Sequence, residues 1–175
     1  MPQAAAEQKP VLDPENTVYL DLPAGRVVIQ LRPDVAPNTV ARFKELVRQG
    51  FYNGLAFHRV IPGFMAQTGD PLGNGTGGSG KHLKAEFSDA PHVRGTVSMA
   101  RASDPDSADS QFFICFATSS FLDHKYTVFG QVVSGMEAVD KVKMGTQQNN
   151  GAVTDPTKIV KAEVAADADK VKVKK

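Results

Sequence analysis

The stretch Phe57–Asp70, which reads FHRVIPGFMAQTGD, decides the fold class that we expect for this chain. Two short apolar runs, residues 57–61 and 64–67, are separated by a Pro-Gly turn signal, a pattern typical of two strands joined by a turn. An arginine, Arg59, and a glutamine, Gln67, stand within these apolar strands. Polar side chains embedded in this way form the constellation that stands out as a candidate site.

Further short strands lie on both sides of this stretch. Alternating apolar residues indicate a hairpin over residues 17–31, and apolar runs between turn residues predict strands at 96–100, 111–116, 127–133 and 159–164. Helical spacing occurs twice, from Pro37 to Gly50 and from Gly135 to Met144. Many short strands with two helices, one early and one late, favour a mainly β, closed antiparallel barrel capped by two α-helices over alternating βαβ units.

Composition and charge are typical of one globular domain. The chain has 175 residues, 41% of them hydrophobic, and its 20 Lys and Arg against 19 Asp and Glu leave a net charge of +1. We expect one domain over residues 16–166, between a flexible N-terminal arm (1–15) and a basic C-terminal tail (167–175). A chain so nearly neutral has no field to hold nucleic acid or an acidic membrane surface, so we expect neither partner. We also expect a monomer.

The N-terminus and the cysteine content bear on the cellular compartment. The first residues lack the basic flank and apolar run of a secretory signal, and no segment reaches the ~18 apolar residues of a membrane span. We therefore expect a cytoplasmic protein, and this observation leaves a processed periplasmic form open as the alternative. The single cysteine, Cys115, cannot form an internal disulfide, and its apolar neighbours predict a buried strand residue.

Several familiar kinds of site are disfavoured. The glycine-rich loop Gly73–Gly80 imitates phosphate-binding motifs, but these need a strand before the loop and a helix after it, and Pro71 and Pro91 disrupt both flanks. The four histidines have no metal-ligand spacing, and there is no Gly-x-Ser-x-Gly nucleophile motif. We therefore expect no metal and no cofactor.

The polar constellation resembles the signature of the cyclophilin family of peptidyl-prolyl cis-trans isomerases. Three separated blocks carry the resemblance: residues 57–70, residues 98–100 with 109–114, and residues 121–123 with 128–130. The resemblance extends in consistent order from about Val18 to about Val164. It implies an eight-stranded antiparallel β-barrel capped by two helices, and an enzyme that accelerates rotation about X–Pro bonds in unfolded or flexible protein segments and so assists folding.

The resemblance also assigns roles residue by residue. It implies that Arg59 is the catalytic arginine and that Gln67 and Phe113 act with it. The proline pocket and the groove for the peptide backbone are implied at eight further positions: Phe64, Met65, Ala100, Arg101, Gln111, Phe121, Leu122 and Tyr126.

Three of these positions depart from the commonest pattern of the family. Phe121 stands where tryptophan is frequent, Tyr126 where histidine is frequent, and Arg101 where many members have asparagine. A single-domain chain with Phe121 and Tyr126 resembles bacterial members. The loss of tryptophan implies only weak binding of cyclosporin-type cyclic peptides.

The chemistry agrees with a site that has no nucleophile, metal or cofactor. Rotation about an X–Pro bond breaks no covalent bond, but amide resonance imposes a barrier of roughly 18–20 kcal/mol. In the twisted transition state the imide nitrogen becomes pyramidal, so a donor such as Arg59 bonds it better than it bonds the planar ground state. A non-catalytic module that binds proline peptides, or a holding chaperone on the same barrel, is the alternative, and it would not need Arg59.

Overall fold

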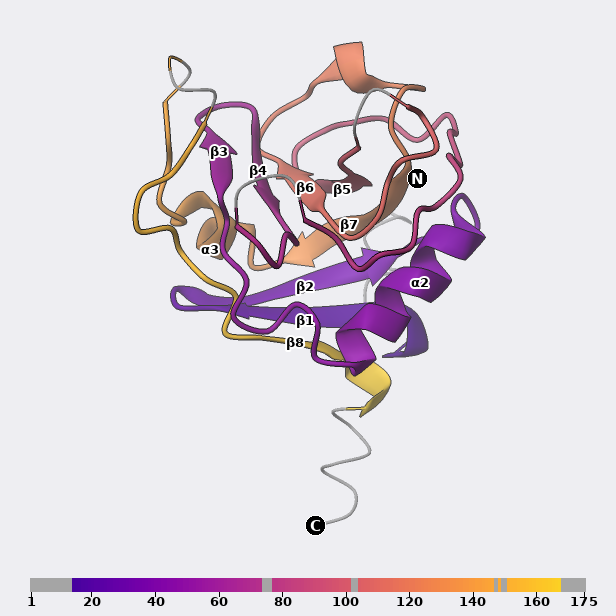
Figure 1. The fold of residues 1–175 in the computed structure, drawn as a ribbon, viewed down its shortest axis with the longest axis horizontal. Helices are drawn as coiled ribbons and strands as arrows, with labels where there is room; N and C mark the ends of the chain where they lie inside the picture. Colours follow the sequence, from indigo (N-terminus) through magenta and orange to yellow (C-terminus); the bar gives the residue numbers. More distant parts are fainter. Residues whose placement is uncertain (1–13, 74–76, 102–103, 147, 149–150, 168–175) are drawn as a thin grey trace, which may run out of the picture.

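The computed structural model describes residues 14–167, except 74–76, 102–103, 147 and 149–150. Its core is one eight-stranded antiparallel sheet (Figure 1). The strands are β1 (Thr17–Leu22), β2 (Gly25–Leu31), β3 (Arg59–Ile61), β4 (Met65–Thr68), β5 (Thr96–Met99), β6 (Phe112–Cys115), β7 (Val128–Ser134) and β8 (Lys161–Val164). Each contains an apolar run that the sequence predicted, so the mainly β class is confirmed.

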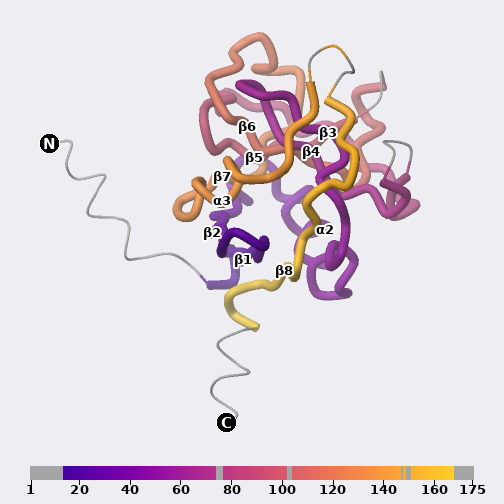
Figure 2. Tube along the Cα trace, turned by 90° about the vertical axis from the view of Figure 1, so that its left-hand side faces the viewer, coloured from indigo at the N-terminus to yellow at the C-terminus, as the bar shows by residue number. Residues whose placement is uncertain are grey.

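The strand order shows how the sheet is divided. It is β3-β4-β6-β5-β7-β2-β1-β8, with antiparallel pairing throughout. Figures 1 and 2 show β1, β2 and β8 in one half of the molecule and β3, β4, β5 and β6 in the other. Long-range pairing therefore assembles the half that holds the candidate site from chain segments about 50 residues apart, such as β4 with β6.

The expected closed barrel is not what the structure shows, because β3 and β8 are the two edges of a curled sheet. Irregular backbone spans the gap between them: Phe57 donates to the Thr157 carbonyl (2.8 Å) and Val60 to the Gly151 carbonyl (2.8 Å). Pro156 has no N–H to donate, and the preceding residue, Asp155, adopts a positive φ of 52°. A regular ladder cannot run through this segment, so isolated bridges replace a closing strand pair.

Two predicted helices are present. α2 (Pro37–Arg48) starts with proline at its first turn and buries Val40, Phe43, Leu46 and Val47, as its spacing predicted. The Glu86 carboxylate caps its N-terminus by accepting from the Asn38 and Thr39 N–H groups at 3.1 and 2.8 Å. α3 (Met136–Asp140) is shorter than expected, and residues 165–167 form a helical turn that was not predicted.

The expected arm and tail fall mostly on residues 1–13 and 168–175, which lie outside the described residues. Pro14 and Glu15 instead belong to a 3-10 helix, η1 (Pro14–Asn16). The Glu15 carboxylate accepts from Arg48 (3.0 Å) and Lys44 (3.1 Å), and these bonds lower its pKa to about 2. Asp167 also pairs with Arg48, at 3.0 Å. These contacts join both ends of the described chain to α2.

Side-chain alternation separates two apolar clusters. The main core lies between the sheet and α2, where the Phe43 ring packs against Tyr52, Phe112 and Phe129 at centroid distances of 5.2, 5.3 and 4.9 Å. A second set, which we name the pocket cluster, comprises Ile61, Met65, Phe113, Cys115 and Leu122, with Phe64, Ala100 and Tyr126 packed against it. Among the described residues no helix is long and apolar enough to cross a membrane.

Candidate functional site

A cavity of about 130 Å³ opens over the pocket cluster, and we name it the Arg59 pocket. Two guanidinium groups and one amide share its lining with apolar and aromatic side chains: Arg59, Phe64, Met65, Gln67, Ala100, Arg101, Phe113, Leu122 and Tyr126. All of these residues are among those that the sequence placed at the site. Gln111 and Phe121, which were also expected there, lie beside the pocket rather than in its lining.

The period-two alternation of the strands explains this convergence. In β4, Met65 and Gln67 face the pocket and Ala66 faces the main core. In β6, Phe113 faces the pocket and Phe112 the main core. Antiparallel register then places Gln67 directly opposite both Arg59 on β3 and Phe113 on β6. A register slip of one residue would send every one of these side chains to the other face.

A chain of side-chain hydrogen bonds holds the polar part of the pocket. Arg59 Nη1 donates to Gln67 Oε1 at 3.1 Å, and Gln67 Nε2 donates to Gln111 Oε1 at 2.9 Å. Gln111 Nε2 in turn donates to the Gly77 carbonyl at 3.0 Å. Gln111 therefore belongs to the site through Gln67. Partial burial lowers the pKa of the Arg59 guanidinium and Tyr126 opposes that shift, but a guanidinium stays charged in proteins.

Aromatic contacts fix the walls of the pocket. The Phe113 and Tyr126 rings meet edge to face at a centroid distance of 5.8 Å. The Arg101 guanidinium lies 4.8 Å from the centre of the Tyr126 ring, and its Nε and Nη2 donate to the Lys125 carbonyl at 3.1 and 2.8 Å. Two departures from the common family pattern, Arg101 and Tyr126, therefore stabilise each other at one wall.

Phe121 occupies a neighbouring hollow. It lies on η2 (Ser120–Leu122), is 63% exposed, and packs its ring 5.5 Å from that of Phe64. Since Phe64 lines both the Arg59 pocket and this hollow, Phe121 extends the apolar surface at the rim.

His92, one of the four histidines without metal-ligand spacing, is a buried residue with two polar partners beside the pocket. Its ring is fully buried, with Nδ1 3.0 Å from Asp123 Oδ1 and Nε2 3.0 Å from Ser98 Oγ. The ring stacks near Phe113, at 6.0 Å between centroids. No local sequence pattern predicts these contacts, because Asp123 lies 31 positions further along the chain.

The glycine-rich loop does not form a phosphate site in its described part. Asp109 Oδ1 accepts from the Ser79 N–H at 2.6 Å, and Asp109 Oδ2 accepts from the Gly80 N–H at 3.1 Å. A carboxylate thus occupies the amides that a phosphate would need and would repel one. Within the described residues no group of His, Cys, Asp and Glu is arranged to hold a metal ion.

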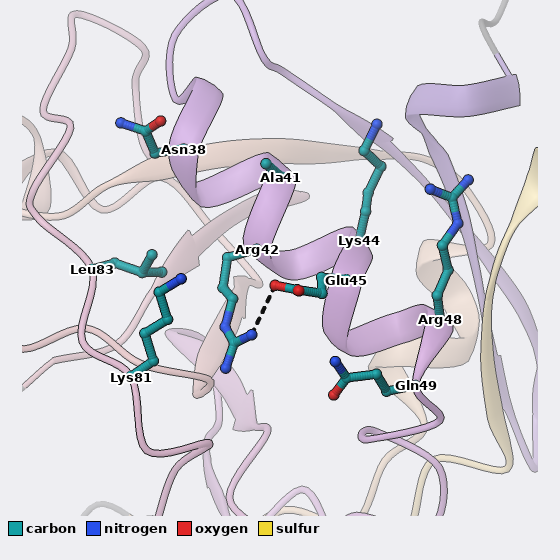
Figure 3. Close-up of a pocket in the computed structure, with 9 residues that line it drawn as sticks. All are labelled: Asn38, Ala41, Arg42, Lys44, Glu45, Arg48, Gln49, Lys81 and Leu83. Atoms are coloured by element: carbon teal, nitrogen blue, oxygen red, sulfur yellow. Dashed lines mark hydrogen bonds and ion pairs between the residues drawn. The ribbon is translucent and has the colours of Figure 1, made fainter.

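A second hollow, of about 860 Å³, lies along α2 and is rich in cations (Figure 3). Arg42 pairs with Glu45 at 2.8 Å, and Lys44 and Arg48 pair with Glu15. Because Arg42, Lys44 and Arg48 are engaged in ion pairs on an open surface, this hollow offers less preorganised chemistry than the Arg59 pocket.

Comparison with known proteins agrees with this geometry. The model of a family described as cyclophilin type peptidyl-prolyl cis-trans isomerase/CLD matches residues 17–164. The chain is 57% identical to a probable peptidyl-prolyl cis-trans isomerase of Brucella suis, over 93% of this chain and 89% of that protein. A peptidyl-prolyl cis-trans isomerase of Helicobacter pylori is 47% identical over 69% of this chain and 76% of its own length.

Solved structures show the same likeness. A cyclophilin from Hirschia baltica superimposes with a TM-score of 0.79 at 30% identity, covering 89% of this chain and 76% of its own. A cyclophilin type isomerase from Cryptosporidium parvum, crystallised in the presence of the dipeptide Ala-Pro, gives a TM-score of 0.77 at 28% identity, over 85% and 98% of the two chains. With a family model spanning nearly all of the described residues, this chain belongs to the cyclophilin-type peptidyl-prolyl cis-trans isomerases.

Proposed function

We propose that Arg59 drives the isomerisation by donating a hydrogen bond to the imide nitrogen of an X–Pro bond, while the apolar walls of the Arg59 pocket hold the proline ring. The observation that carries this proposal is a charged guanidinium, oriented by Gln67, on the wall of a small cavity floored by Phe113 and Met65. In the planar ground state the nitrogen lone pair is delocalised, so the bond strengthens as the amide twists.

The energy required shows that Arg59 does not act alone. Uncatalysed isomerisation takes tens to hundreds of seconds, and a rate of about 1,000 per second would need a barrier about 7 kcal/mol lower. A hydrogen bond from a charged group contributes about 1.5–3 kcal/mol. The remainder is assigned to groove residues, which fix one side of the peptide while the other side rotates about the proline that the pocket holds.

Gln67 and Gln111 keep the guanidinium in position. Gln67 accepts from Arg59 through a neutral amide, so this bond orients the guanidinium without neutralising its charge. The substrates we propose are proline-containing peptides and unfolded proteins. The Cryptosporidium relative, whose structure was determined in the presence of Ala-Pro, supports this class. A monomer suffices, since one chain supplies the whole lining of the pocket.

Exchange NMR on a short X–Pro peptide tests this function against the binding-module alternative. Catalytic amounts of the protein should produce exchange cross-peaks between the cis and trans forms within a mixing time far shorter than the uncatalysed lifetime. A holding module would shift or broaden the peptide signals without producing exchange, and that outcome would exclude the proposed function.

The activity should depend little on pH near neutrality. Burial lowers the pKa of His58 and of His92 below the ordinary value of 6.5, so both rings are mainly neutral from pH 6.5 to 8. Below pH 6.5 the unfolded chain binds protons that the folded chain does not, so the free energy of unfolding should decrease as the pH falls. We expect kcat/KM to vary less than about twofold from pH 6.5 to 8. A bell-shaped profile in that range would point to a titrating catalytic group and contradict the mechanism.

Tyr126 should act through its shape and not through its hydroxyl. The ring forms one wall of the pocket, where it meets Phe113 edge to face. Tyr126→Phe should therefore keep most of the wild-type kcat/KM. Tyr126→Ala opens the wall and removes the ring that the Arg101 guanidinium contacts, so it should lower kcat/KM several-fold and raise KM. Steady-state kinetics on one X–Pro peptide, with circular dichroism to confirm folding, makes the comparison. Equal losses in the two variants would assign a role to the hydroxyl.

Phe121 should limit the affinity for cyclosporin-type cyclic peptides. Its exposed ring offers less area than an indole and no N–H donor. We expect Phe121→Trp to bind such a peptide more tightly by roughly 1–3 kcal/mol, measured by titration calorimetry. An unchanged affinity in the folded variant would show that the rim at this position does not contact the ligand.

A further inference from the structure

Three hydrogen bonds connect His92 to the segment that carries the outer wall of the Arg59 pocket. Its N–H donates to Asp123 Oδ1 at 2.8 Å, and its ring Nδ1 lies 3.0 Å from the same oxygen. Its carbonyl accepts from the Ser119 N–H at 2.8 Å. Ser119 immediately precedes η2 and Asp123 immediately follows it. One residue therefore holds both ends of the turn that presents Phe121 and Leu122.

The ring of His92 also supports the inner walls. It lies nearly parallel to Phe113, with 6.0 Å between centroids and 18° between planes, and it meets Tyr126 at 77° and 6.4 Å. His92 itself does not line the pocket and is 0% exposed. Two side chains that do line it, Phe113 and Tyr126, therefore pack against one buried imidazole.

The hydrogen-bond pattern fixes the form of the imidazole. Asp123 can only accept, so Nδ1 carries the proton, and in a neutral ring Nε2 is an acceptor. The single Ser98 hydroxyl proton is then donated to Nε2 in place of the Thr127 carbonyl. The Thr127 carbonyl, which Ser98 also reaches at 3.0 Å, already accepts from the Met99 N–H at 2.9 Å. A neutral ring therefore leaves no buried partner unsatisfied, which agrees with the lowered pKa that burial gives His92.

We propose that His92 is the positioning residue of the Arg59 pocket: it fixes η2 through Asp123 and Ser119 and supports Phe113 and Tyr126 with its ring. This inference rests on the proposed function, because it assumes that the pocket is where the proline ring binds. Arg59 lies on β3 and its guanidinium donates to Gln67, whereas the hydrogen bonds of His92 run to Ser98, Ser119 and Asp123. Loss of His92 should therefore loosen the grip on the ring without displacing the donor.

The kinetic signature differs from that of a merely structural defect. If the pocket binds the ground state and the transition state more weakly by the same amount, KM rises and kcat stays nearly unchanged. A variant that simply folds less completely has fewer active molecules, which lowers the apparent kcat and leaves KM unchanged. The separation of kcat from KM therefore decides between positioning and general stability.

The test compares two variants that remove the anchor in different ways. His92→Phe keeps a ring beside Phe113 but loses both ring hydrogen bonds, and Asp123→Ala removes the acceptor of the ring and of the backbone N–H while leaving His92 in place. We expect each to raise KM, and the Kd of an Ala-Pro peptide measured by NMR titration, at least fivefold with kcat within twofold of wild type. Asp123→Asn, which retains an acceptor oxygen, should recover most of the affinity.

Asp89→Ala is the matched control, because it removes the carboxylate of another His–Asp pair, the exposed one with His124 (2.9 Å). It should leave KM and kcat unchanged. If KM stays within twofold of wild type in folded His92→Phe and Asp123→Ala, or if kcat alone falls, the positioning role is wrong. Should His92→Phe fail to fold, Asp123→Ala decides alone. Failure of the proposed function itself would appear separately, as an isomerase activity that survives Arg59→Ala.

Discussion

Arg59→Ala should lower kcat/KM by at least about 100-fold while the protein stays folded. The substitution removes the donor to the imide nitrogen but opens no cavity in the main core, because Arg59 is only half-buried and faces the pocket. Gln67 keeps its other hydrogen bond, to Gln111 at 2.9 Å, so the floor of the site should persist. A coupled protease assay and thermal unfolding measure the two quantities on the same preparation.

The control removes a guanidinium from elsewhere on the surface. Arg32 pairs with the exposed carboxylate of Asp34 at 2.8 Å and is not among the residues that line the pocket. Arg32→Ala changes the net charge as Arg59→Ala does, and it should leave kcat/KM unchanged. An Arg59→Ala protein that kept more than half of the wild-type rate would remove this residue from the mechanism.

Phe113→Ala should also cause a large loss of activity, of at least about tenfold in kcat/KM. The Phe113 ring forms the floor of the pocket, and an aromatic contact with a buried proline ring is worth about 1.5–3 kcal/mol. The stability cost should be smaller than for a core phenylalanine, because the pocket cluster is small and the cavity left by the ring is open to water.

Its neighbour on the same strand provides the comparison. Phe112 points to the other face of β6, where it contacts Phe43, Tyr52 and Phe129. Phe112→Ala should cost about 3–5 kcal/mol of unfolding free energy but leave kcat/KM of the folded molecules nearly unchanged. Urea unfolding and single-peptide kinetics on both variants test this. The separation of pocket from core would be refuted if activity fell equally in the two.

Elements with a strong sequence period were predictable. The hairpin β1–β2 alternates apolar and polar residues, and α2 repeats its apolar residues at helical spacing between Pro37 and Gly50. The local sequence pattern is therefore sufficient to predict each element. The family resemblance then placed the pocket residues. Their convergence rests on antiparallel register, as in the opposition of Gln67 to Arg59 and Phe113.

Features that depend on distant or irregular contacts could not be predicted. β3 and β8 stay unpaired where Asp155 has a positive φ and Pro156 has no N–H to donate, and the hydrophobic periodicity of the sequence does not predict this. His92 looked like an isolated histidine because its partners Ser98 and Asp123 are brought to it only by tertiary folding. Likewise, the contact of Arg101 with Tyr126 joins residues on separate segments.

The central claim is that Arg59 stabilises the transition state more than it binds the substrate. The most direct test is exchange NMR on wild type and Arg59→Ala, each saturated with the same X–Pro peptide, so that the peptide Kd and the cis-trans interconversion rate of the bound peptide are measured separately. We predict that the Kd changes less than about threefold while the bound interconversion rate falls at least about 100-fold. A Kd that weakens while the bound rate stays at the wild-type value would contradict the claim and make Arg59 a binding residue only.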